Sequence, residues 1–319
     1  MRKMLAVLLA AAMVAGVFAL GGCGKKTARP VSRESLTETV QVGDITIAYR
    51  VYGGTRSYPL IMIMGYGASQ DAWDPNVLRD LARQYKVITF DNRGIGYSTT
   101  GYSKFTIPQF ADDTAGLMQA LSIKQADVLG WSMGTYIAQE LILRHPGVVN
   151  KLVLYAGDCG GTQAIKPQPS VVQTLVDASG TLTERGERLL PLLFPAPWLA
   201  KKSNQAYLKR TLGASPQERV PSDNVMKQGL AIAGWGGSYD RLPTITSPTL
   251  VVTGTDDVII PPGNTAIIAN RVQGAWTSYL RGGGHGVMFQ YPHEFAKILL
   301  GFLSSPQGLI RKPTAGMFW

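Results

Sequence analysis

Apolar residues along the chain occur either in short continuous runs or at a spacing of three to four positions. Continuous runs are typical of strands covered on both faces, and the wider spacing is typical of helices packed on one side. The runs predict strands at 60–64, 86–90, 126–129, 151–155, 249–253 and 275–280, and an earlier alternating stretch predicts a hairpin of strands 39–42 and 45–51. The wider spacing predicts helices at 75–84, 107–121, 135–144, 262–271 and 293–304. This alternation predicts an α/β fold with a mostly parallel central sheet and helices on both faces.

One long segment, 160–240, interrupts the alternation. It is rich in proline and polar residues, and helical spacing recurs near 170–178, 182–190 and 203–212. We interpret it as a helical cap inserted between two parts of one core, 36–159 and 241–305, because such lids commonly shape substrate access. Residues 306–319 have no clear period, and we interpret them as a loose tail.

The segment Gly130-Trp131-Ser132-Met133-Gly134 lies between a predicted strand and a predicted helix. A Gly-x-Ser-x-Gly pattern in this setting is typical of a nucleophile elbow, a sharp turn that exposes the serine oxygen in a strained backbone conformation. The flanking glycines are needed because a Cβ there would collide with neighbouring backbone. Ser132 is therefore the candidate nucleophile.

A serine hydroxyl needs a base to take its proton, and histidine is the usual base near neutral pH. The chain has three histidines. His145 precedes a proline at the end of a predicted helix, and His293 begins the last predicted helix, so both are expected to cap helices or lie at the surface. His285 follows the last predicted strand within the glycine-rich stretch 282–286. Its loop can bring an imidazole over the edge of the sheet, which makes His285 the favoured base.

The base in turn needs a carboxylate that fixes its tautomer. Asp256 and Asp257 follow the strand predicted at 249–253. The carboxyl ends of parallel strands are where ligands bind in open α/β sheets. Either residue is thus placed to serve as the acid.

The chain order Ser132, Asp257, His285 and the elbow motif resemble serine hydrolases of the α/β-hydrolase family, over about residues 36–304. The resemblance implies the α/β-hydrolase fold. It also implies that Asp257 is the acid, because in relatives the acid stands three residues after the glycine of this loop. Asp256 is the adjacent alternative, and Asp158 is a second one because some members take the acid from the preceding strand.

The oxyanion of an acyl-transfer intermediate needs hydrogen-bond donors. The backbone N–H of Met133 is one candidate, at the start of the elbow helix, where the helix dipole also helps. Met64-Gly65-Tyr66-Gly67 resembles the family's His-Gly-x-Gly motif, which implies that the Tyr66 N–H is the second donor; Met64 replaces the usual histidine. The segment 91–98 resembles a structural family loop, in which we expect Arg93 to tie loops together.

The first 22 residues are interpreted as a signal peptide rather than as part of the fold. Arg2 and Lys3 precede an apolar run at 4–20, and Leu20-Gly21-Gly22-Cys23 resembles the bacterial lipobox. This resemblance implies cleavage before Cys23, lipid attachment to its sulfur, and a protein held on the extracytoplasmic face of the bacterial membrane. The alternatives are an ordinary signal peptide, or an uncleaved anchor, with an incidental cysteine.

Charge and composition add to this picture. The formal net charge is +10, and loss of Arg2 and Lys3 with the signal peptide leaves +8. Basic residues in 23–35 are expected to form a polar tether near anionic lipid headgroups. A secreted chain without a dense basic and aromatic stripe is not expected to bind nucleic acid. Three histidines and one remaining cysteine form no recognisable metal site, and no motif indicates a cofactor.

Together these features predict a membrane-anchored serine hydrolase, with small carboxylic esters as the expected substrates. Peptidase, C–C bond hydrolase and cofactor-free perhydrolase activities use similar triads, and a binding or sensing protein without turnover is the alternative from another class.

Cys159 is expected to be a packing residue. A further set of apolar side chains is expected either to line an acyl pocket or to pack in the core: Trp131, Trp198, Trp235 and Met288.

Overall fold

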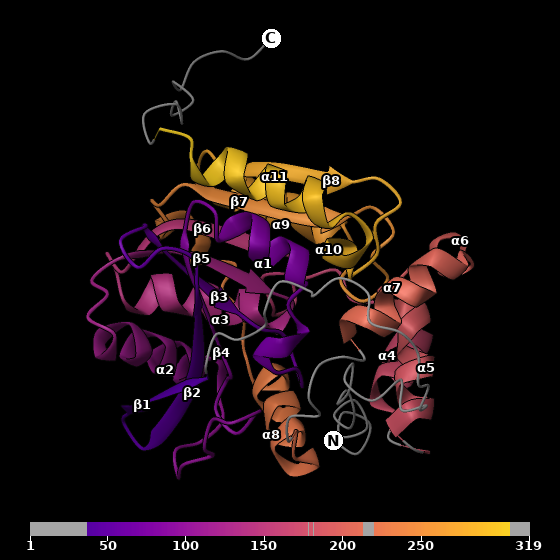
Figure 1. Cartoon of the computed structure of the whole chain (residues 1–319), viewed down its shortest axis with the longest axis horizontal. Helices are drawn as coiled ribbons and strands as arrows, with labels where there is room; N and C mark the ends of the chain where they lie inside the picture. The colour runs from indigo at the N-terminus through magenta and orange to yellow at the C-terminus, as the bar shows by residue number, and fades with distance from the viewer. Residues whose placement is uncertain (1–36, 178, 181, 213–219, 307–319) are drawn as a thin grey trace, which may run out of the picture.

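An eight-stranded sheet runs through the part of the chain that the computed structural model describes, residues 37–177, 179–180, 182–212 and 220–306 (Figure 1). Its order is β1-β2-β4-β3-β5-β6-β7-β8. The strands are β1 (Glu38–Val42), β2 (Ile45–Tyr52), β3 (Pro59–Ile63), β4 (Lys86–Phe90), β5 (Ala126–Trp131), β6 (Val149–Tyr155), β7 (Thr249–Gly254) and β8 (Trp276–Leu280). β1 and β2 pair antiparallel, β2 joins β4 antiparallel, and all later pairs are parallel. The predicted α/β fold with a mostly parallel sheet is confirmed.

The predicted signal peptide at 1–22, the tether at 23–35 with Cys23, and nearly all of the tail at 306–319 lie outside the described residues. Within the described ranges, no helix combines the length and the apolar character needed to cross a membrane.

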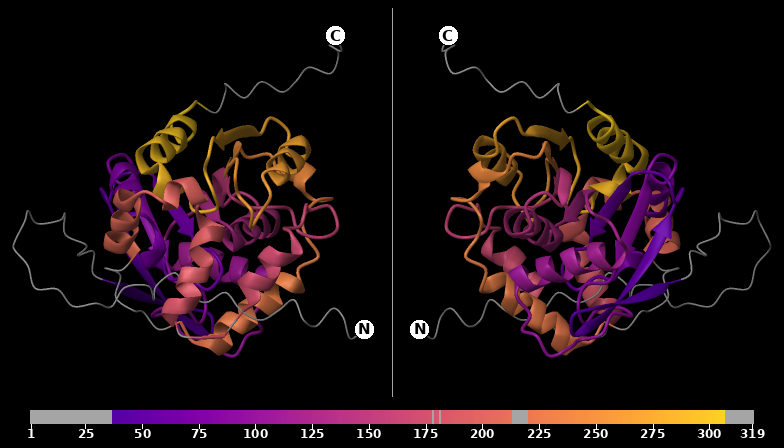
Figure 2. Two further views of the ribbon diagram at one scale, coloured as in Figure 1. Left: turned by 90° about the vertical axis from the view of Figure 1, so that its right-hand side faces the viewer. Right: turned by 90° about the vertical axis from the view of Figure 1, so that its left-hand side faces the viewer.

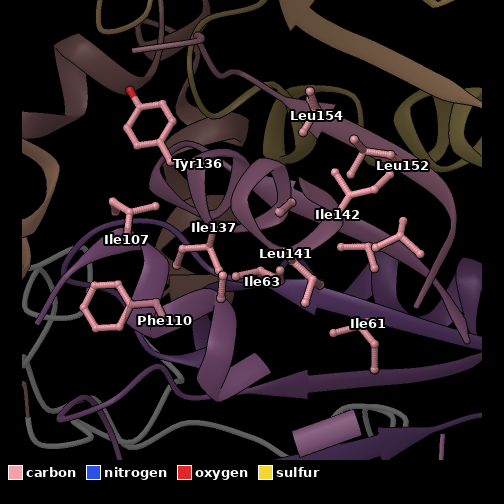
Figure 3. Packing of buried hydrophobic residues seen from close by; sticks show 14 of the residues in the cluster. Ile61, Ile63, Ile107, Phe110, Tyr136, Ile137, Leu141, Ile142, Leu152 and Leu154 are labelled. Carbon is pink, nitrogen blue, oxygen red and sulfur yellow. The ribbon is translucent and has the colours of Figure 1, made fainter. Parts of the chain in front are cut away.

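Helices cover both faces of the sheet and bury the two sides of each strand. On one face lie α2 (Ile107–Ala120), α3 (Met133–Arg144) and α9 (Gly263–Arg271), and on the other lie α1 (Pro75–Leu81) and α11 (Pro292–Leu303). Alternate residues of β3 show the division, because Ile61 and Ile63 join the α2–α3 side and Leu60 and Met62 join the α1–α11 side. Figure 3 shows Ile61 and Ile63 beside the apolar residues of α3. Continuous apolar runs follow from burial of both strand faces.

Helix starts match the local sequence. The carboxylate of Asp74 accepts hydrogen bonds from the N–H groups of Asn76 and Val77, and Pro75 occupies the first helical position of α1. The hydroxyl of Thr106 accepts a bond from the Gln109 N–H at the start of α2. These contacts satisfy N–H groups that have no acceptor within a helix.

The segment between β6 and β7 carries its own helices. They are α4 (Pro169–Val176), α5 (Leu182–Leu193), α6 (Ala196–Leu199), α7 (Lys202–Leu212) and α8 (Ser222–Ala233). In Figure 1 α4 to α7 gather at one side of the molecule, and α8 lies apart from them; the left view of Figure 2 faces this side. The sequence pattern did not predict α8 or the short helices α6 and α10 (Val287–Gln290).

Because β3 and β5 to β8 are parallel, their carboxyl ends lie along one edge of the sheet. The elbow, the Asp257 loop and the His285 loop follow β5, β7 and β8 at this edge. The end of α5 packs against the last of these loops, since the Gly286 N–H donates to the Leu193 carbonyl at 2.9 Å. The inserted helices therefore contact the edge where the candidate residues gather.

Candidate active site

Ser132 occupies a strained turn between β5 and α3. Its φ of 56° and ψ of −121° lie outside the ordinary regions for a residue with a side chain. A Cβ on Gly130 would lie 2.2 Å from the Gly134 carbonyl oxygen, so the turn closes only with glycine at this position. The Ser132 carbonyl accepts bonds from the Thr135 N–H at 2.8 Å and from the Thr135 hydroxyl at 2.7 Å. These bonds help to hold the strained conformation at the head of α3.

His285 and Asp257 meet in a buried hydrogen bond. Asp257 Oδ2 lies 2.8 Å from His285 Nδ1, and both residues are 3% exposed. Asp257 Oδ1 accepts bonds from the N–H groups of Ile259 and Ile260, each at 2.9 Å. One carboxylate oxygen is thus fixed by the backbone and the other faces the imidazole. This contact orients the ring and leaves Nε2 as the nitrogen that can serve a substrate or nucleophile.

The two alternative acids have other partners. Asp256 is exposed and accepts a bond from the Thr255 hydroxyl at 2.7 Å. Asp158 accepts bonds from the Tyr136 hydroxyl at 3.0 Å and from the Gly160 N–H at 2.6 Å. Burial raises the pKa of Asp158. Of the three candidate acids, Asp257 is the one that the structure brings to His285.

The other histidines lie away from this contact. His145 ends α3, where its Nε2 lies 2.7 Å from Asp112. His293 is at the start of α11, with its side chain 61% exposed and its Nδ1 2.5 Å from Asp80. Both therefore have surface or helix-end positions, as expected.

The turn that carries Ser132 and the loop that carries His285 are joined through the backbone carbonyl of His285. The Tyr155 hydroxyl donates to that carbonyl at 2.7 Å, and Trp131 Nε1 donates to it at 3.3 Å. The Trp131 ring lies 5.8 Å from the imidazole and stacks on Tyr155 at 5.7 Å. Trp131 immediately precedes Ser132, so these contacts couple the two loops. Sequence reasoning missed Tyr155, although a tyrosine that ends a buried apolar strand signals a hydroxyl with a specific partner.

The loop after β3 runs directly past Ser132. A Cβ on Gly65 would lie 3.2 Å from Ser132 Cβ, which shows how closely the two backbones approach. The Asn92 side chain supports this loop by donating to the Met64 carbonyl at 3.1 Å. Tyr66 follows Gly65 in this loop, and the Met133 N–H belongs to the first turn of α3, where N–H groups lack an acceptor within the helix. Sequence reasoning missed Asn92.

Arg93 connects loops at the same edge. Its side chain is fully buried and pairs with Asp44 at 2.8 Å and with Asp113 at 2.6 Å. It also donates to the Thr100 carbonyl at 3.2 Å. The guanidinium holds the pKa of Asp44 well below its usual range. Arg93 therefore has the structural role expected from the sequence.

The remaining candidate side chains are mostly buried. Cys159 is fully buried, and burial raises the pKa of its thiol to about 11, so it is not an activated nucleophile. Met288 is 0% exposed, and Trp235 stacks on Tyr136 at 4.7 Å. Trp198 is partly exposed and stacks on Phe194 at 5.0 Å. Within the described ranges, His, Cys, Asp and Glu side chains form no group of three or more that could hold a metal ion.

Comparisons with known proteins agree with this architecture. The family model described as the alpha/beta hydrolase fold matches residues 58–290. A Caulobacter protein named as the carbamate hydrolase RutD is 29% identical over 267 residues, covering 80% of this chain and 95% of the relative. A Mycobacterium tuberculosis protein named as the non-heme bromoperoxidase BpoC is 31% identical, covering 77% of this chain and 94% of the relative.

A solved structure gives the same result. The esterase RhEst1 from Rhodococcus is 26% identical, superposes with a TM-score of 0.72, and covers 85% of this chain and 99% of its own. The family model matches well over half of the chain, and the matches to these relatives cover nearly the whole length of each relative. The names of RutD and RhEst1 are those of hydrolases, whereas BpoC is named as a bromoperoxidase. The chain belongs to the α/β-hydrolase fold family.

Proposed function

We propose that the protein is a serine hydrolase that works by acyl transfer through Ser132, His285 and Asp257. Ser132 Oγ attacks the substrate carbonyl while His285 Nε2 takes the hydroxyl proton. The same proton is returned to the leaving alcohol, whose bond to the acyl carbon breaks. Water then attacks the acyl-enzyme and gives a proton to His285. His285 passes this proton to Ser132 Oγ as the bond between Oγ and the acyl carbon breaks and the acid leaves. Asp257 holds the imidazole in the tautomer that this sequence of steps needs.

The observation that carries the proposal is the buried contact of Asp257 with His285 at the edge of the sheet that also carries the strained Ser132 turn. The serine at φ 56° is in a strained conformation, and the histidine is fixed by a carboxylate at 2.8 Å. Both arrangements have a clear use in acyl transfer. Trp131 precedes Ser132 and contacts His285, which supports the placement of the base next to the nucleophile.

Two backbone N–H groups, those of Tyr66 and Met133, are proposed to donate hydrogen bonds to the substrate oxygen as negative charge develops on it. The close approach of Gly65 to Ser132 supports the first, and the position of Met133 at the start of α3 supports the second. Each such donor contributes on the order of 3 kcal/mol to transition-state stabilisation. Backbone donors do not depend on the residue at position 64, so Met64 leaves them intact.

Carboxylic esters are the proposed substrates. An esterase of known structure resembles this chain over nearly its whole length, which supports this choice. The test is hydrolysis of a p-nitrophenyl ester series by the wild type and by Ser132→Ala. We expect turnover that falls by at least about 1,000-fold in the variant, because the oxyanion donors alone leave only residual catalysis. A binding protein without turnover would instead show no hydrolysis in the wild type, and Ser132→Ala would retain full affinity.

We further propose that lipid on Cys23 anchors the protein to the extracytoplasmic face of the bacterial membrane. The lipobox-like sequence before Cys23 supports this, and attached acyl chains give about 0.8 kcal/mol for each buried CH₂. Membrane fractionation of the wild type and of Cys23→Ala, with and without the signal-peptidase inhibitor globomycin, provides the test. We expect globomycin-sensitive processing and loss of membrane association in the variant. A wild type recovered in the soluble fraction would refute the anchor.

A further inference from the structure

The buried face of α8 carries two polar residues, Asn224 and Gln228. α8 buries Asn224, Val225, Gln228 and Ala231, which is the spacing of one helix face. Gln228 lies in the middle of this face and is 0% exposed. Burial of a carboxamide is unfavourable unless its oxygen and both of its N–H groups find partners. The contacts of Gln228 therefore bear on what this face of the cap does.

The oxygen of Gln228 is bonded to the loop that passes the nucleophile. The Gly67 N–H donates to Gln228 Oε1 at 2.9 Å. This bond fixes the orientation of the carboxamide, because a backbone N–H can only donate and the atom facing it must be the oxygen. Gly67 is two residues after Gly65, whose backbone lies against Ser132. A cap side chain is thus attached to the loop that bears the proposed Tyr66 donor.

The nitrogen of Gln228 is left without an acceptor. Nε2 is buried and has no hydrogen-bond partner within the part of the chain that the structure describes. Nearly all buried polar side-chain atoms in folded proteins have a partner, and a donor without one costs free energy. The same fixed orientation that satisfies Oε1 places this donor next to the loop after β3. An acceptor supplied by a bound molecule would satisfy it.

We propose that Gln228 is a specificity residue, whose Nε2 donates to an oxygen of the substrate a few atoms from the scissile carbonyl. The inference rests on the proposed serine hydrolase function. It narrows the substrate class to esters that carry an additional ether or carbonyl oxygen close to the ester group. Through Oε1, Gln228 also positions the loop after β3 that bears the proposed Tyr66 donor, and this second role is independent of the substrate.

Matched substrate pairs separate the two roles. One pair is p-nitrophenyl methoxyacetate and p-nitrophenyl butanoate, in which an oxygen replaces a methylene of the acyl chain. The other is 2-methoxyethyl butanoate and butyl butanoate, in which the replacement is on the alcohol side. Gln228→Met keeps the side-chain length and removes all hydrogen bonding. In this variant we expect kcat/KM to fall for every ester, because the Gly67 loop loses its hydrogen bond to α8. For the oxygen-bearing member of one pair, kcat/KM should fall about tenfold further.

Asn224→Ala is the matched control. Asn224 lies one turn earlier on the same buried face and donates to the Gly94 carbonyl and the Thr100 hydroxyl, each at 2.9 Å. Its loss loosens α8 without touching the Gly67 loop, so both members of each pair should be affected equally. If Gln228→Met does not fold, Gln228→Leu replaces it, because it also removes the NH₂ donor and keeps the buried face of α8 apolar at this position; the same selective loss is expected.

Equal losses within both pairs would overturn the inference. This failure is distinct from failure of the proposed function. If a fluorophosphonate labels Ser132 in the same preparation, the serine hydrolase proposal stands and only the Gln228 role is refuted. A folded wild type that stays unlabelled would refute both proposals.

Discussion

Removal of the Tyr155 hydroxyl tests how the base is held. Tyr155 is 0% exposed, and burial raises the pKa of its phenol well above 10, so the hydroxyl stays protonated and can donate throughout the assay range. It donates to the His285 carbonyl at 2.7 Å and accepts a bond from the Met288 N–H at 3.2 Å. Tyr155→Phe leaves the ring in place and removes both bonds. Among the residues that the structure describes, the His285 carbonyl then keeps only the longer bond from Trp131, at 3.3 Å.

The magnitude follows from these contacts. Leaving buried partners unpaired costs about 1–3 kcal/mol of stability. A catalytic group displaced by about 1 Å loses on the order of 100-fold in rate. Because Tyr155 touches the backbone of His285 rather than its ring, we expect a smaller displacement and a fall in kcat of about 10- to 100-fold. KM should change little, since no substrate contact is removed.

Tyr136→Phe is the control. Tyr136 is likewise buried, with the pKa of its phenol also raised well above 10 by burial, but its hydroxyl donates to Asp158 at 3.0 Å. Urea unfolding should show comparable losses of stability for the two variants, and ester kinetics should show a large loss of kcat for Tyr155→Phe alone. Full kcat in Tyr155→Phe would refute the positioning role. A collapse of kcat in Tyr136→Phe instead would favour Asp158 as the acid.

Three further predictions concern the acid, the elbow glycine and a buried carboxyl group. Asp257→Asn should lower kcat by about 10,000-fold with Asp256→Asn near wild type, and the reverse order in steady-state kinetics would reassign the acid. Gly130→Ala should lower both the melting temperature and kcat, because its Cβ would lie 2.2 Å from a backbone oxygen; unchanged values would contradict the tight turn. Burial raises the pKa of Asp127 to about 6, so the folded chain binds the extra proton between pH 4 and 6 and stability falls as pH rises through that window. In urea unfolding, the free energy of unfolding of Asp127→Asn should therefore rise relative to that of the wild type by up to about 3 kcal/mol between pH 4 and 7. A difference that does not depend on pH would refute this.

Much of the fold could be predicted because the central strands are buried on both faces. Leu60 to Ile63 read as a continuous apolar run, since alternate residues pack on different helix layers. α8 escaped prediction because its buried face includes Asn224 and Gln228, whose partners are distant loops. A pattern of apolar spacing contains no information on such pairs.

The candidate site was predicted only in part, for a similar reason. The chain order and the motif around Ser132 indicated which residue types to join, and the glycines around His285 indicated a bend. The choice among acidic residues depended on a resemblance, because sequence position alone cannot show that Asp257 faces the imidazole while Asp256 faces solvent. Tyr155 and Gln228 were missed because each acts on a loop more than 100 residues away in sequence.

The central claim is that Ser132 is an activated nucleophile, and fluorophosphonate labelling tests it most directly. The purified protein and its Ser132→Ala variant would be labelled, digested and analysed by mass spectrometry. We predict one adduct on the peptide that contains Ser132, formed as the serine oxygen displaces fluoride from phosphorus, and no adduct in the variant. A folded wild type that stays unlabelled, or labelling that persists in Ser132→Ala, would contradict the account.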